Sequence, residues 1–268
     1  MFNKSVIYKD KLYFYKLEII SYMKSYNVCL KDTVKKFTKK LFYSLFDCNH
    51  EEQHADYLEK TFLEILEKLE IENSHDIWKT FKGDLPNIRR QLDLDAIAFE
   101  NNDPASHCLE EIYMAYPGFH AISIYRLSHA LYNLDVYILP RMMSEYIHGI
   151  TGIDIHPGAT IGESFYIDHG TGIVIGETAI IGKDVKIYQG VTLGGISVSK
   201  SLASTKRHPT IADNVCIYAN ATILGGDIVI GANSIIGANV WITESVPESS
   251  LVTYQTEIKI RPKKNGIR

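Results

Sequence analysis

An aliphatic residue recurs every six positions through the second half of the chain. A helix repeats at about 3.6 residues and an extended strand at 2, so neither explains a sustained period of six. A β-helix does, because each hexapeptide forms one short side and a turn, and its aliphatic residue points into a shared interior. The register slips by two residues and later by one, and the repeated positions are Ile155, Ile161, Ile167, Ile173, Ile175, Ile181, Ile187, Leu193, Ile211, Ile217, Ile223, Ile230, Ile236 and Ile242. At about 18 residues per three-sided coil, this stretch predicts about four coils.

The repeat is interrupted once, by a polar, serine-rich stretch that is out of period. We predict that residues 196–208 form a loop ejected from one coil, which is a favourable position for a binding lid. The repeat ends after Pro247, and the residues that follow, 251–268, form a basic tail that we expect to be a solvated extension.

The first half of the chain shows the apolar spacing of helices instead. Two predicted helical faces consist of Val34, Phe37, Leu41, Phe42, Leu45 and Phe46, and of Leu58, Phe62, Ile65, Leu66 and Leu69. A third helix is predicted to begin after Asp84, with Pro86 in its first turn, and to end before Pro104; its apolar face carries Ile88, Leu92, Ala96 and Phe99. Two more are predicted over 109–115 and 120–132, with a turn at 116–118 between them, and a last one from Pro140 to about His148.

The pattern therefore predicts an α+β protein in three parts: a helical N-terminal domain (1–150), a β-helix domain (151–250) and the tail (251–268). With 268 residues, a net charge of −4 and a pI near 6.2, the chain has no electrostatic footprint for nucleic acid. Its four cysteines are scattered, without metal-ligand spacing or a disulfide framework. We expect a cytoplasmic protein, since no signal peptide is recognisable and no apolar run reaches the ~20 residues that span a membrane.

Polar residues that interrupt the repeat are the candidates for chemistry. Asp154 and His169 are 15 residues apart, so they can lie on successive coils close enough to interact. A carboxylate that binds one imidazole nitrogen leaves the other free as a base near neutral pH. On spacing alone, both residues can equally well occupy turns and bond to the backbone. Asp168 beside His169, and Arg207 with His208 at the end of the loop, complete the group.

Four sequence runs, together, resemble the serine O-acetyltransferases, which are hexapeptide-repeat enzymes of cysteine biosynthesis. The runs are DIHPGATIG (154–162), DHGTGIVIGETAIIG (168–182), GVTLGG (190–195) and KRHP (206–209). The resemblance implies a left-handed parallel β-helix and transfer of the acetyl group of acetyl-CoA to the hydroxyl of L-serine, giving O-acetyl-L-serine and CoA. No metal is implied.

The resemblance also implies a role for each matching residue. His169 matches the general base and Asp154 the acid that orients it, while Asp103 and Asp168 match the carboxylates that meet the substrate ammonium. Arg207 matches the residue that meets the substrate carboxylate, and His208 a second histidine in that pocket. Gly195 and Ala219 match positions where the backbone meets the pantetheine arm of CoA. The N–H groups of residues 194–195 are candidate oxyanion donors, or else plain corner glycines.

Partners follow from the same resemblance. The family forms homotrimers through the β-helix, with each site between two solenoids, and helical domains commonly pair the trimers into hexamers. L-cysteine is expected to inhibit, because it is nearly isosteric with serine. Many relatives end in an isoleucine that enters O-acetylserine sulfhydrylase; this sequence ends at Arg268, which counts against that complex.

Three other functions remain open at this point. An acetyltransferase for another acceptor, such as a sugar, shares the scaffold but does not need two carboxylates and an arginine to bind an amino acid. A metal-dependent hydratase, similar to the γ-class carbonic anhydrases, would use three histidines such as His156, His169 and His208, although no two of them have the expected spacing of five residues. A non-catalytic solenoid would need none of these groups. We expect His156 and His120 to be structural, and Cys216 to be a small structural residue.

Overall fold

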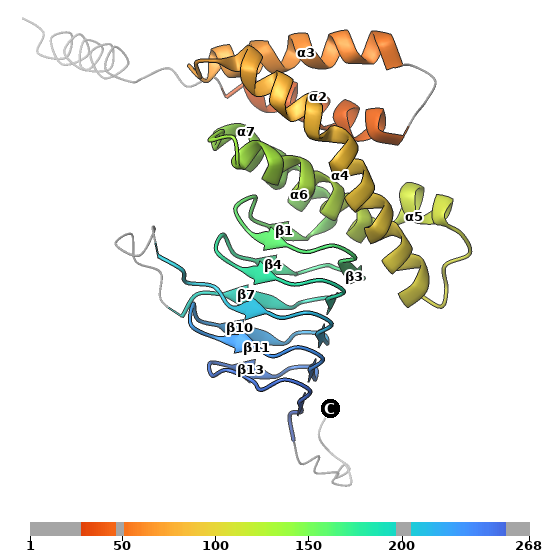
Figure 1. The fold of residues 1–268 in the computed structure, drawn as a ribbon, viewed down its shortest axis with the longest axis vertical. Coiled ribbons are helices and arrows are strands. Elements are labelled where there is room, and N and C mark those ends of the chain that lie inside the picture. Colours follow the sequence, from red (N-terminus) through yellow and green to blue (C-terminus); the bar gives the residue numbers. More distant parts are fainter. Residues whose placement is uncertain (1–27, 47–50, 197–204, 256–268) are drawn as a thin grey trace, which may run out of the picture.

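The computed structural model describes residues 28–46, 51–196 and 205–255. A layer of helices lies at one end of a solenoid of short strands (Figure 1). The described helices are α2 (Leu30–Phe46), α3 (Glu51–Lys68), α4 (Ser74–Asn102), α5 (Leu109–Ala115), α6 (Pro117–Tyr132) and α7 (Ile138–Thr151). The first 27 residues, the middle of the predicted loop and the end of the predicted tail, including Arg268, lie outside the described residues.

The strands form three parallel sheets, which are the three faces of the solenoid. The first face contains β1 (Asp154–Ile155), β4 (Val174–Ile175), β7 (Thr192–Gly194), β10 (Thr222–Leu224) and β13 (Trp241–Ile242). The second contains β2 (Thr160–Ile161), β5 (Ile180–Ile181), β8 (Thr210–Ile211) and β11 (Val229–Ile230). The third contains β3 (Tyr166–Asp168), β6 (Lys186–Tyr188), β9 (Cys216–Ile217), β12 (Ile235–Ile236) and β14 (Leu251–Val252).

This arrangement confirms the predicted hexapeptide solenoid. Its strands make four complete coils and part of a fifth, close to the predicted number. Neighbouring coils pair in register, as in Ile155 with Ile175 and Ile175 with Leu193. All fourteen aliphatic positions of the predicted repeat are buried. The handedness implied by the resemblance stays a prediction.

Two edges of the solenoid carry predicted site residues, and we name each edge by one of them. The His169 corner consists of the turns that join the third face to the first, at residues 169–173, 189–191 and 219–221. The Arg207 corner consists of the turns that join the first face to the second, at 156–159, 176–179 and 205–209. The predicted loop departs from this second corner, between β7 and β8.

The predicted helical faces are largely confirmed. The buried side chains of α2 include Val34, Phe37, Leu41 and Phe42, and α3 buries Leu58, Phe62, Ile65 and Leu66, while Leu45, Phe46 and Leu69 pack partly buried against the same core. Helix α5 has the predicted bounds, and α7 extends the predicted last helix at both ends. Helix α6 begins earlier than predicted, at Pro117, because proline suits the first turn of a helix, where its missing N–H has no partner to lose.

The predicted helix start at Asp84 is wrong. Helix α4 begins at Ser74 and continues through Pro86. Trp78 and Phe81 before the proline and Ile88 after it are all buried on this helix, and burying large apolar side chains stabilises by about 1.5–3 kcal/mol each. That outweighs the ~3 kcal/mol that an interior proline costs.

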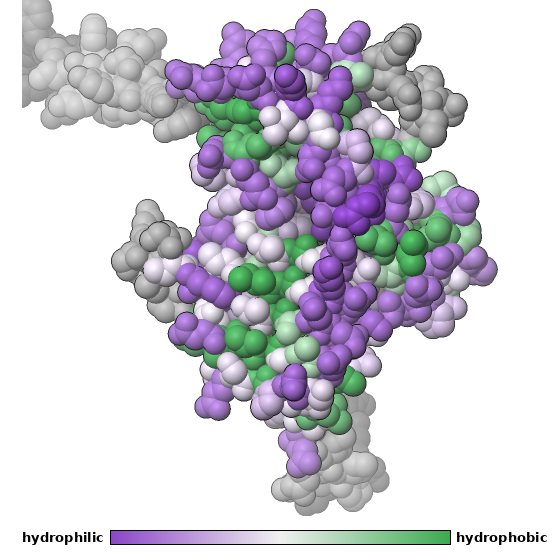
Figure 2. All heavy atoms as spheres, viewed as in Figure 1, coloured by the Kyte–Doolittle hydropathy of each residue, from purple (hydrophilic) through white to green (hydrophobic). Residues whose placement is uncertain are grey.

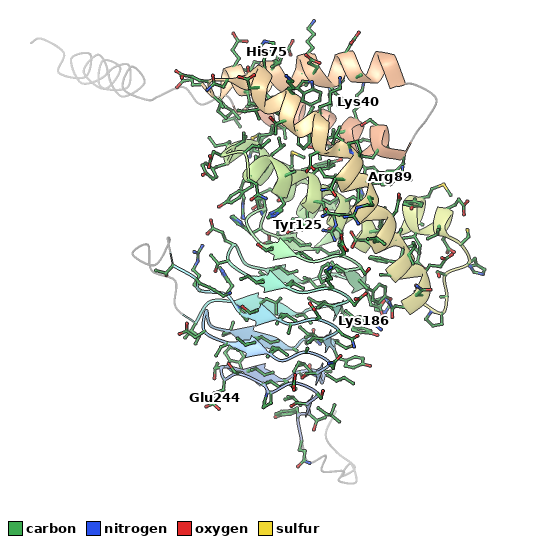
Figure 3. The ribbon with its side chains drawn as sticks, viewed as in Figure 1. Lys40, His75, Arg89, Tyr125, Lys186 and Glu244 are labelled. Atoms are coloured by element: carbon green, nitrogen blue, oxygen red, sulfur yellow. The ribbon has the colours of Figure 1, made fainter. Side chains whose placement is uncertain are left out.

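A buried ion pair between α4 and α6 connects both helices to the first coil. Nε and Nη2 of Arg126 donate to the two carboxylate oxygens of Asp95 at 2.5 and 2.7 Å, and Nη2 also donates to the carbonyl of Gly162 at 2.8 Å. Asp95 in turn accepts the backbone N–H of Phe165 at 2.9 Å. Tyr125, labelled at this junction in Figure 3, donates to the carbonyl of Ala159 at 2.5 Å. One continuous apolar core joins the helices to the coils.

On the face of the molecule drawn in Figure 2, the solenoid is more apolar than the outer helices. Figure 2 shows hydrophobic side chains gathered over its middle coils, below a largely hydrophilic helical layer. On the first face, Val174 and Trp241 are 39% and 68% exposed. Within the described residues, no helix is long and apolar enough to cross a membrane.

Candidate functional site

His169 lies in a two-residue insertion at the His169 corner. Successive coils stack there through backbone hydrogen bonds from Gly172 to Gly152, from Gly190 to Thr171 and from Asn220 to Gln189. Gly172 therefore occupies the place that Gly190 and Asn220 hold in later coils, and residues 169 and 170 are additional. The slip of two residues in the sequence repeat has this origin.

The insertion forces an unusual backbone. His169 has a φ of 56°, in the left-handed region, which is uncommon for residues other than glycine, although asparagine, aspartate and histidine adopt it more often than the rest. Gly170 follows with a φ of 87°, and a Cβ there would lie 2.4 Å from Cδ1 of Ile153. Only glycine fits this position, and the tight turn leaves the His169 side chain 73% exposed.

A pocket of about 670 Å³ opens beside this turn, where α4 ends, α6 begins and β3 ends. Asp103, Asp168 and His169 all line it. The close packing is possible because α6 approaches β3 at a glycine: a Cβ on Gly118 would lie 2.9 Å from the carbonyl oxygen of Ile167. The structure thus brings together three of the predicted site residues, one from the helical part and two from the first coil.

The pocket combines two carboxylates with one imidazole. Nε2 of His169 lies 3.8 Å from Oδ1 of Asp168. Asp103 accepts hydrogen bonds from the hydroxyl of Tyr116 at 2.7 Å and from the N–H of Ala105 at 2.8 Å. These two donors, Tyr116 first, lower the pKa of Asp103, and the nearby charge of His169 acts in the same direction. The pocket is therefore suited to a small cation such as an ammonium group.

Asp154 lies on the same side of the first face as His169. It begins β1, two residues after Gly152, whose carbonyl accepts the N–H of Gly172 in the His169 turn. Its own N–H donates to the carbonyl of Ile173 at 2.9 Å. Among the described residues, the carboxylate in ion-pair range of the imidazole is Asp168 rather than Asp154. The predicted pairing of Asp154 with His169 stays a prediction.

Arg207 and His208 lie at the other edge, at the Arg207 corner. The guanidinium of Arg207 pairs with Glu177, which also accepts the hydroxyl of Tyr132 at 2.9 Å. Burial opposes ionisation of Glu177, but the hydrogen bonds from Arg207 and Tyr132 lower its pKa. The helical part thus reaches this corner too, because Tyr132 is the last residue of α6.

His208 is buried, with 9% of its surface exposed, and its ring is fixed by Thr178. Nδ1 accepts the N–H of Thr178 at 3.0 Å and lies 2.8 Å from its hydroxyl oxygen. Burial, followed by the positive charge of Arg207, lowers the pKa of His208 to about 4. The ring is therefore neutral at ordinary pH, and its proton resides on Nε2.

The two predicted CoA contacts are divided between the same two edges. Gly195 follows β7 at the Arg207 corner, and Ala219 lies in a turn of the His169 corner. The first face separates these edges by about five residues, or roughly 15 Å. One amino acid spans at most ~3.6 Å along the chain, so a single serine cannot bind both edges of one chain.

The three histidines of the hydratase alternative are separated as well. His156 and His208 lie at the Arg207 corner, while His169 lies at the other. Nδ1 of His156 accepts the N–H of Gly158 at 3.0 Å, a turn contact that fits its predicted structural role. Within the described ranges, no group of three or more His, Cys, Asp or Glu side chains is placed to hold a metal ion.

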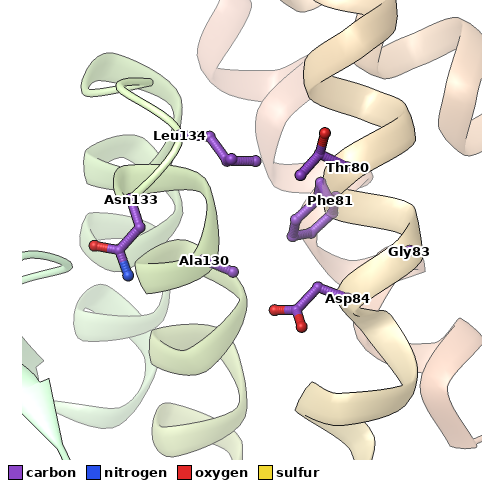
Figure 4. Close-up of a pocket in the computed structure, with 7 residues that line it drawn as sticks. All are labelled: Thr80, Phe81, Gly83, Asp84, Ala130, Asn133 and Leu134. Carbon is purple, nitrogen blue, oxygen red and sulfur yellow. The ribbon is translucent and has the colours of Figure 1, made fainter.

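Figure 4 shows a second pocket, of about 410 Å³, in the groove between α4 and α6. Asp84 is the one titratable side chain among the residues that line it, and it already accepts a hydrogen bond from Asn87 at 3.2 Å. This groove lacks the convergent charges of the His169 pocket.

Sequence reasoning missed three polar residues of the two corners. The sequence places Tyr116 in a turn, Tyr132 in a helix and Glu177 within the run 168–182, and gives none of them a role in the site. The signal for Glu177 is its place two residues beyond the repeat position Ile175. Nothing in the spacing distinguishes Tyr116 or Tyr132 from the other fifteen tyrosines.

The solenoid of hexapeptides, with an imidazole and carboxylates on its edge, defines a protein of the hexapeptide-repeat acyltransferase class. No family model matches the chain. A relative from Synechococcus elongatus, named "serine acetyltransferase, plasmid", is 48% identical over 193 residues, which are 70% of this chain and 60% of that protein. The serine acetyltransferase of Bacillus subtilis is 48% identical over 136 residues, 51% of this chain and 61% of its own. The chain thus spans about 60% of the length of these two relatives.

Solved structures extend the match over most of the chain. Serine acetyltransferase isoform 3 of Entamoeba histolytica, in complex with cysteine, is 36% identical with a TM-score of 0.77, over 87% of this chain and 84% of that one. The Neisseria gonorrhoeae serine acetyltransferase in complex with serine is 30% identical with a TM-score of 0.61, over 87% and 97% of the two chains. The chain belongs to the serine acetyltransferase family.

Proposed function

We propose that this protein transfers the acetyl group of acetyl-CoA to the hydroxyl of L-serine, giving O-acetyl-L-serine and CoA, the first step of cysteine biosynthesis. The observation that carries the proposal is the pocket at the His169 corner, where two carboxylates and an exposed imidazole converge. An ammonium anchor next to a base is what an amino acid with a reactive hydroxyl requires. An acceptor without an ammonium group, such as a simple sugar, gives no role to both Asp103 and Asp168.

In this mechanism the carboxylates of Asp103 and Asp168 bind the substrate ammonium, and His169 takes the proton from the serine hydroxyl. The serine oxygen then attacks the thioester carbonyl, the C–S bond breaks, and the imidazolium returns its proton to the departing CoA sulfur. A positioned base of this kind contributes about 10²–10⁴-fold to the rate. Asp154, at the same corner, orients the imidazole and stabilises its charged form.

The substrate carboxylate is bound by Arg207 and His208, and these come from a partner subunit. The roughly 15 Å width of the first face supports this, because it keeps the two halves of the site apart within one chain. Exposed Val174 and Trp241 on the face between the corners favour contact with another copy. The protein is therefore a homotrimer, or a dimer of such trimers paired through the helical domains.

Acetyl-CoA lies in the same groove between copies. The backbone at Gly195 and at Ala219 contacts its pantetheine arm, one from each edge. Both residues are part-exposed at turns, where backbone groups are accessible. Gly195 and Ala219 of one chain therefore contribute to two different sites. No metal takes part in this reaction.

The helical part contributes to the substrate pocket, since Asp103 ends α4 and Tyr116 precedes α6. L-Cysteine binds the same anchors and inhibits in competition with serine, because a thiol replaces the hydroxyl at nearly equal size. The relatives solved with cysteine support this. An unchanged rate at millimolar cysteine contradicts it.

Thiol release from acetyl-CoA, with and without L-serine, tests the function directly. His169→Ala should lower turnover by about 10²–10⁴-fold while acetyl-CoA still binds. Arg207→Ala should mainly raise the KM for serine. His148→Ala, an exposed imidazole on α7, is the matched control and should change neither constant. Release that is independent of serine, or normal turnover in both site variants, contradicts the proposal.

A further inference from the structure

Tyr116 connects the core to the edge of the candidate pocket. It caps the N-terminus of α6 and lies beside Pro117 and Gly118 in the pocket wall. Its ring packs edge-on against Phe99, with 6.0 Å between centroids and an angle of 88°. Because Phe99 is fully buried, this contact fixes the position of the Tyr116 ring, and the Tyr116 hydroxyl lies at the edge of the pocket.

Within the described part of the chain, that hydroxyl donates to the carboxylate of Asp103. The distance from Oη to Oδ2 is 2.7 Å, while Oδ1 accepts the N–H of Ala105 at 2.8 Å. The hydrogen bond with Asp103 raises the pKa of Tyr116 to about 12, so the phenol stays protonated and remains a donor throughout the working range. With one oxygen bound by each donor, the carboxylate has a single defined orientation.

Apart from these two donors, burial acts against a charged Asp103, and the positive charge of His169 acts in favour of it. Two further carboxylates lie in the same region, Glu111 on α5 and Asp168 on β3. Without a fixed orientation, the carboxylate of Asp103 would turn away from these like charges and from the pocket.

We propose that Tyr116 is a positioning residue for amino-acid binding, which holds the carboxylate of Asp103 ionised and aimed at the substrate ammonium. The inference rests on the proposed function and deepens it. Tyr116 itself does not touch the substrate; it acts through Asp103. It should therefore affect the binding of serine more than the chemical step.

The chain offers a matched control for this contact. Tyr113, three residues earlier on α5, donates to Oδ1 of Asp93 on α4 at 2.9 Å. This bond has the same chemistry and also ties an aromatic residue to α4, but neither partner lines the pocket. Tyr113→Phe thus removes an equivalent hydroxyl without touching the proposed ammonium site.

The experiment compares Tyr116→Phe and Tyr113→Phe in steady-state assays of thiol release. Tyr116→Phe should raise the KM for serine by about threefold to tenfold, as expected for loss of a hydrogen bond to a charged group that is partly replaced by water. Its kcat and its KM for acetyl-CoA should stay within about twofold, because the base and the thioester site are intact. Tyr113→Phe should leave all three constants unchanged.

A double-mutant cycle separates positioning from simple packing. If Tyr116 acts through Asp103, Tyr116→Phe should have no further effect on the KM for serine in an Asp103→Asn background. Additive effects in that cycle overturn the inference, as does a wild-type KM in Tyr116→Phe. An equal loss of kcat and thermal stability in both tyrosine variants also overturns it, because it reveals a purely structural role. Wild-type protein that releases no thiol in response to serine overturns the proposed function and this inference together.

Discussion

At the solenoid corners, most residues with a left-handed backbone conformation are glycine or asparagine, which tolerate it. At the His169 corner the stacked positions hold Gly172, Gly190, Asn220 and Asn239, all with positive φ. His169 is the exception, and such a conformation costs a residue with a bulky side chain about 1–2 kcal/mol. Since the position is an insertion that the coil does not need, this conformation is consistent with the role of base proposed for His169.

Gly170 offers a test of how tightly this turn is built. Gly170→Ala should destabilise the protein by at least about 1–2 kcal/mol, because φ is 87° and the new Cβ would lie 2.4 Å from Ile153. It should also lower activity by displacing His169. Gly83→Ala is the control. Gly83 lies inside α4, and a Cβ added there would have no atom within 4 Å, so the substitution should stabilise the protein by about 0.5–1 kcal/mol. Chemical denaturation measures both, and equal effects of the two substitutions would show that the turn is not constrained.

His208 makes stability depend on pH. Its pKa is about 4 in the folded chain, against an ordinary value near 6.5, so between these values the unfolded chain binds a proton that the folded chain does not. Stability should therefore fall as the pH is lowered from 6.5 towards 4, by up to about 1.4 kcal/mol per pH unit from this residue. Burial lowers the pKa of His120, His129 and His156 as well, and these act with the same sign.

The variant His208→Gln isolates that contribution, because glutamine does not titrate. Its free energy of unfolding should depend less steeply on pH than that of the wild type between pH 6.5 and 5. Urea denaturation at several pH values measures both slopes. Identical slopes would mean that folding does not shift the pKa of His208.

At the level of elements, α4 has the central role. It runs for 29 residues, supplies Asp95 to the buried clamp and ends at the pocket residue Asp103. Arg126 joins this helix to α6 and to the carbonyl of Gly162 in the first coil. The Asp95–Arg126 pair contacts the turn directly before β3, at Gly162 and Phe165, and the last residue of β3 leads into His169. Rigid attachment of helices to this coil thus keeps the two carboxylates and the imidazole of the pocket in one arrangement.

Arg126→Met should destabilise the protein by about 3–5 kcal/mol, since it leaves Asp95 buried without its charge partner. The matched control is Arg90→Ala, because Arg90 also joins α4 to the neighbouring Glu163, at 2.7 Å, but in an exposed pair. Exposed pairs contribute about 0–1 kcal/mol. Thermal and chemical denaturation should separate the two variants clearly. Similar losses would show that Asp95 is neutral or solvated in the folded protein.

At the level of the whole molecule, the decisive feature is that the candidate residues occupy two edges of one prism. In the proposed mechanism, the His169 corner holds the base and the ammonium anchors, and the Arg207 corner holds the carboxylate anchor. Under that proposal a complete site needs two copies of the chain, arranged so that unlike edges meet. A head-to-tail ring, such as a trimer, satisfies this condition because each copy offers both edges.

Mixing the two site variants tests this arrangement, at a serine concentration so low that each variant alone has little activity. Co-expressed His169→Ala and Arg207→Ala chains should regain activity, because an interface between an intact His169 corner and an intact Arg207 corner is complete. Random mixing restores about a quarter of the interfaces. Each variant expressed alone serves as the control. No recovery, despite mixed oligomers on a native gel, would place both halves of the site within one chain.

Periodicity was sufficient to predict the solenoid, its buried residues and the helical half, whereas the site residues follow from the family resemblance of the sequence runs and stay a prediction. These features depend on local patterns, since a period of six selects one side of a coil whatever lies around it. The helix through Pro86 was not predictable, because the apolar burial that overrides the proline comes from distant segments. The same holds for Tyr116 and Glu177, whose roles arise from contacts with Asp103 and Arg207 at separations of 13 and 30 residues. The division of the site between two edges emerged only from the stacking of coils, because the geometry of a prism, and not the order of residues, sets which side chains can meet.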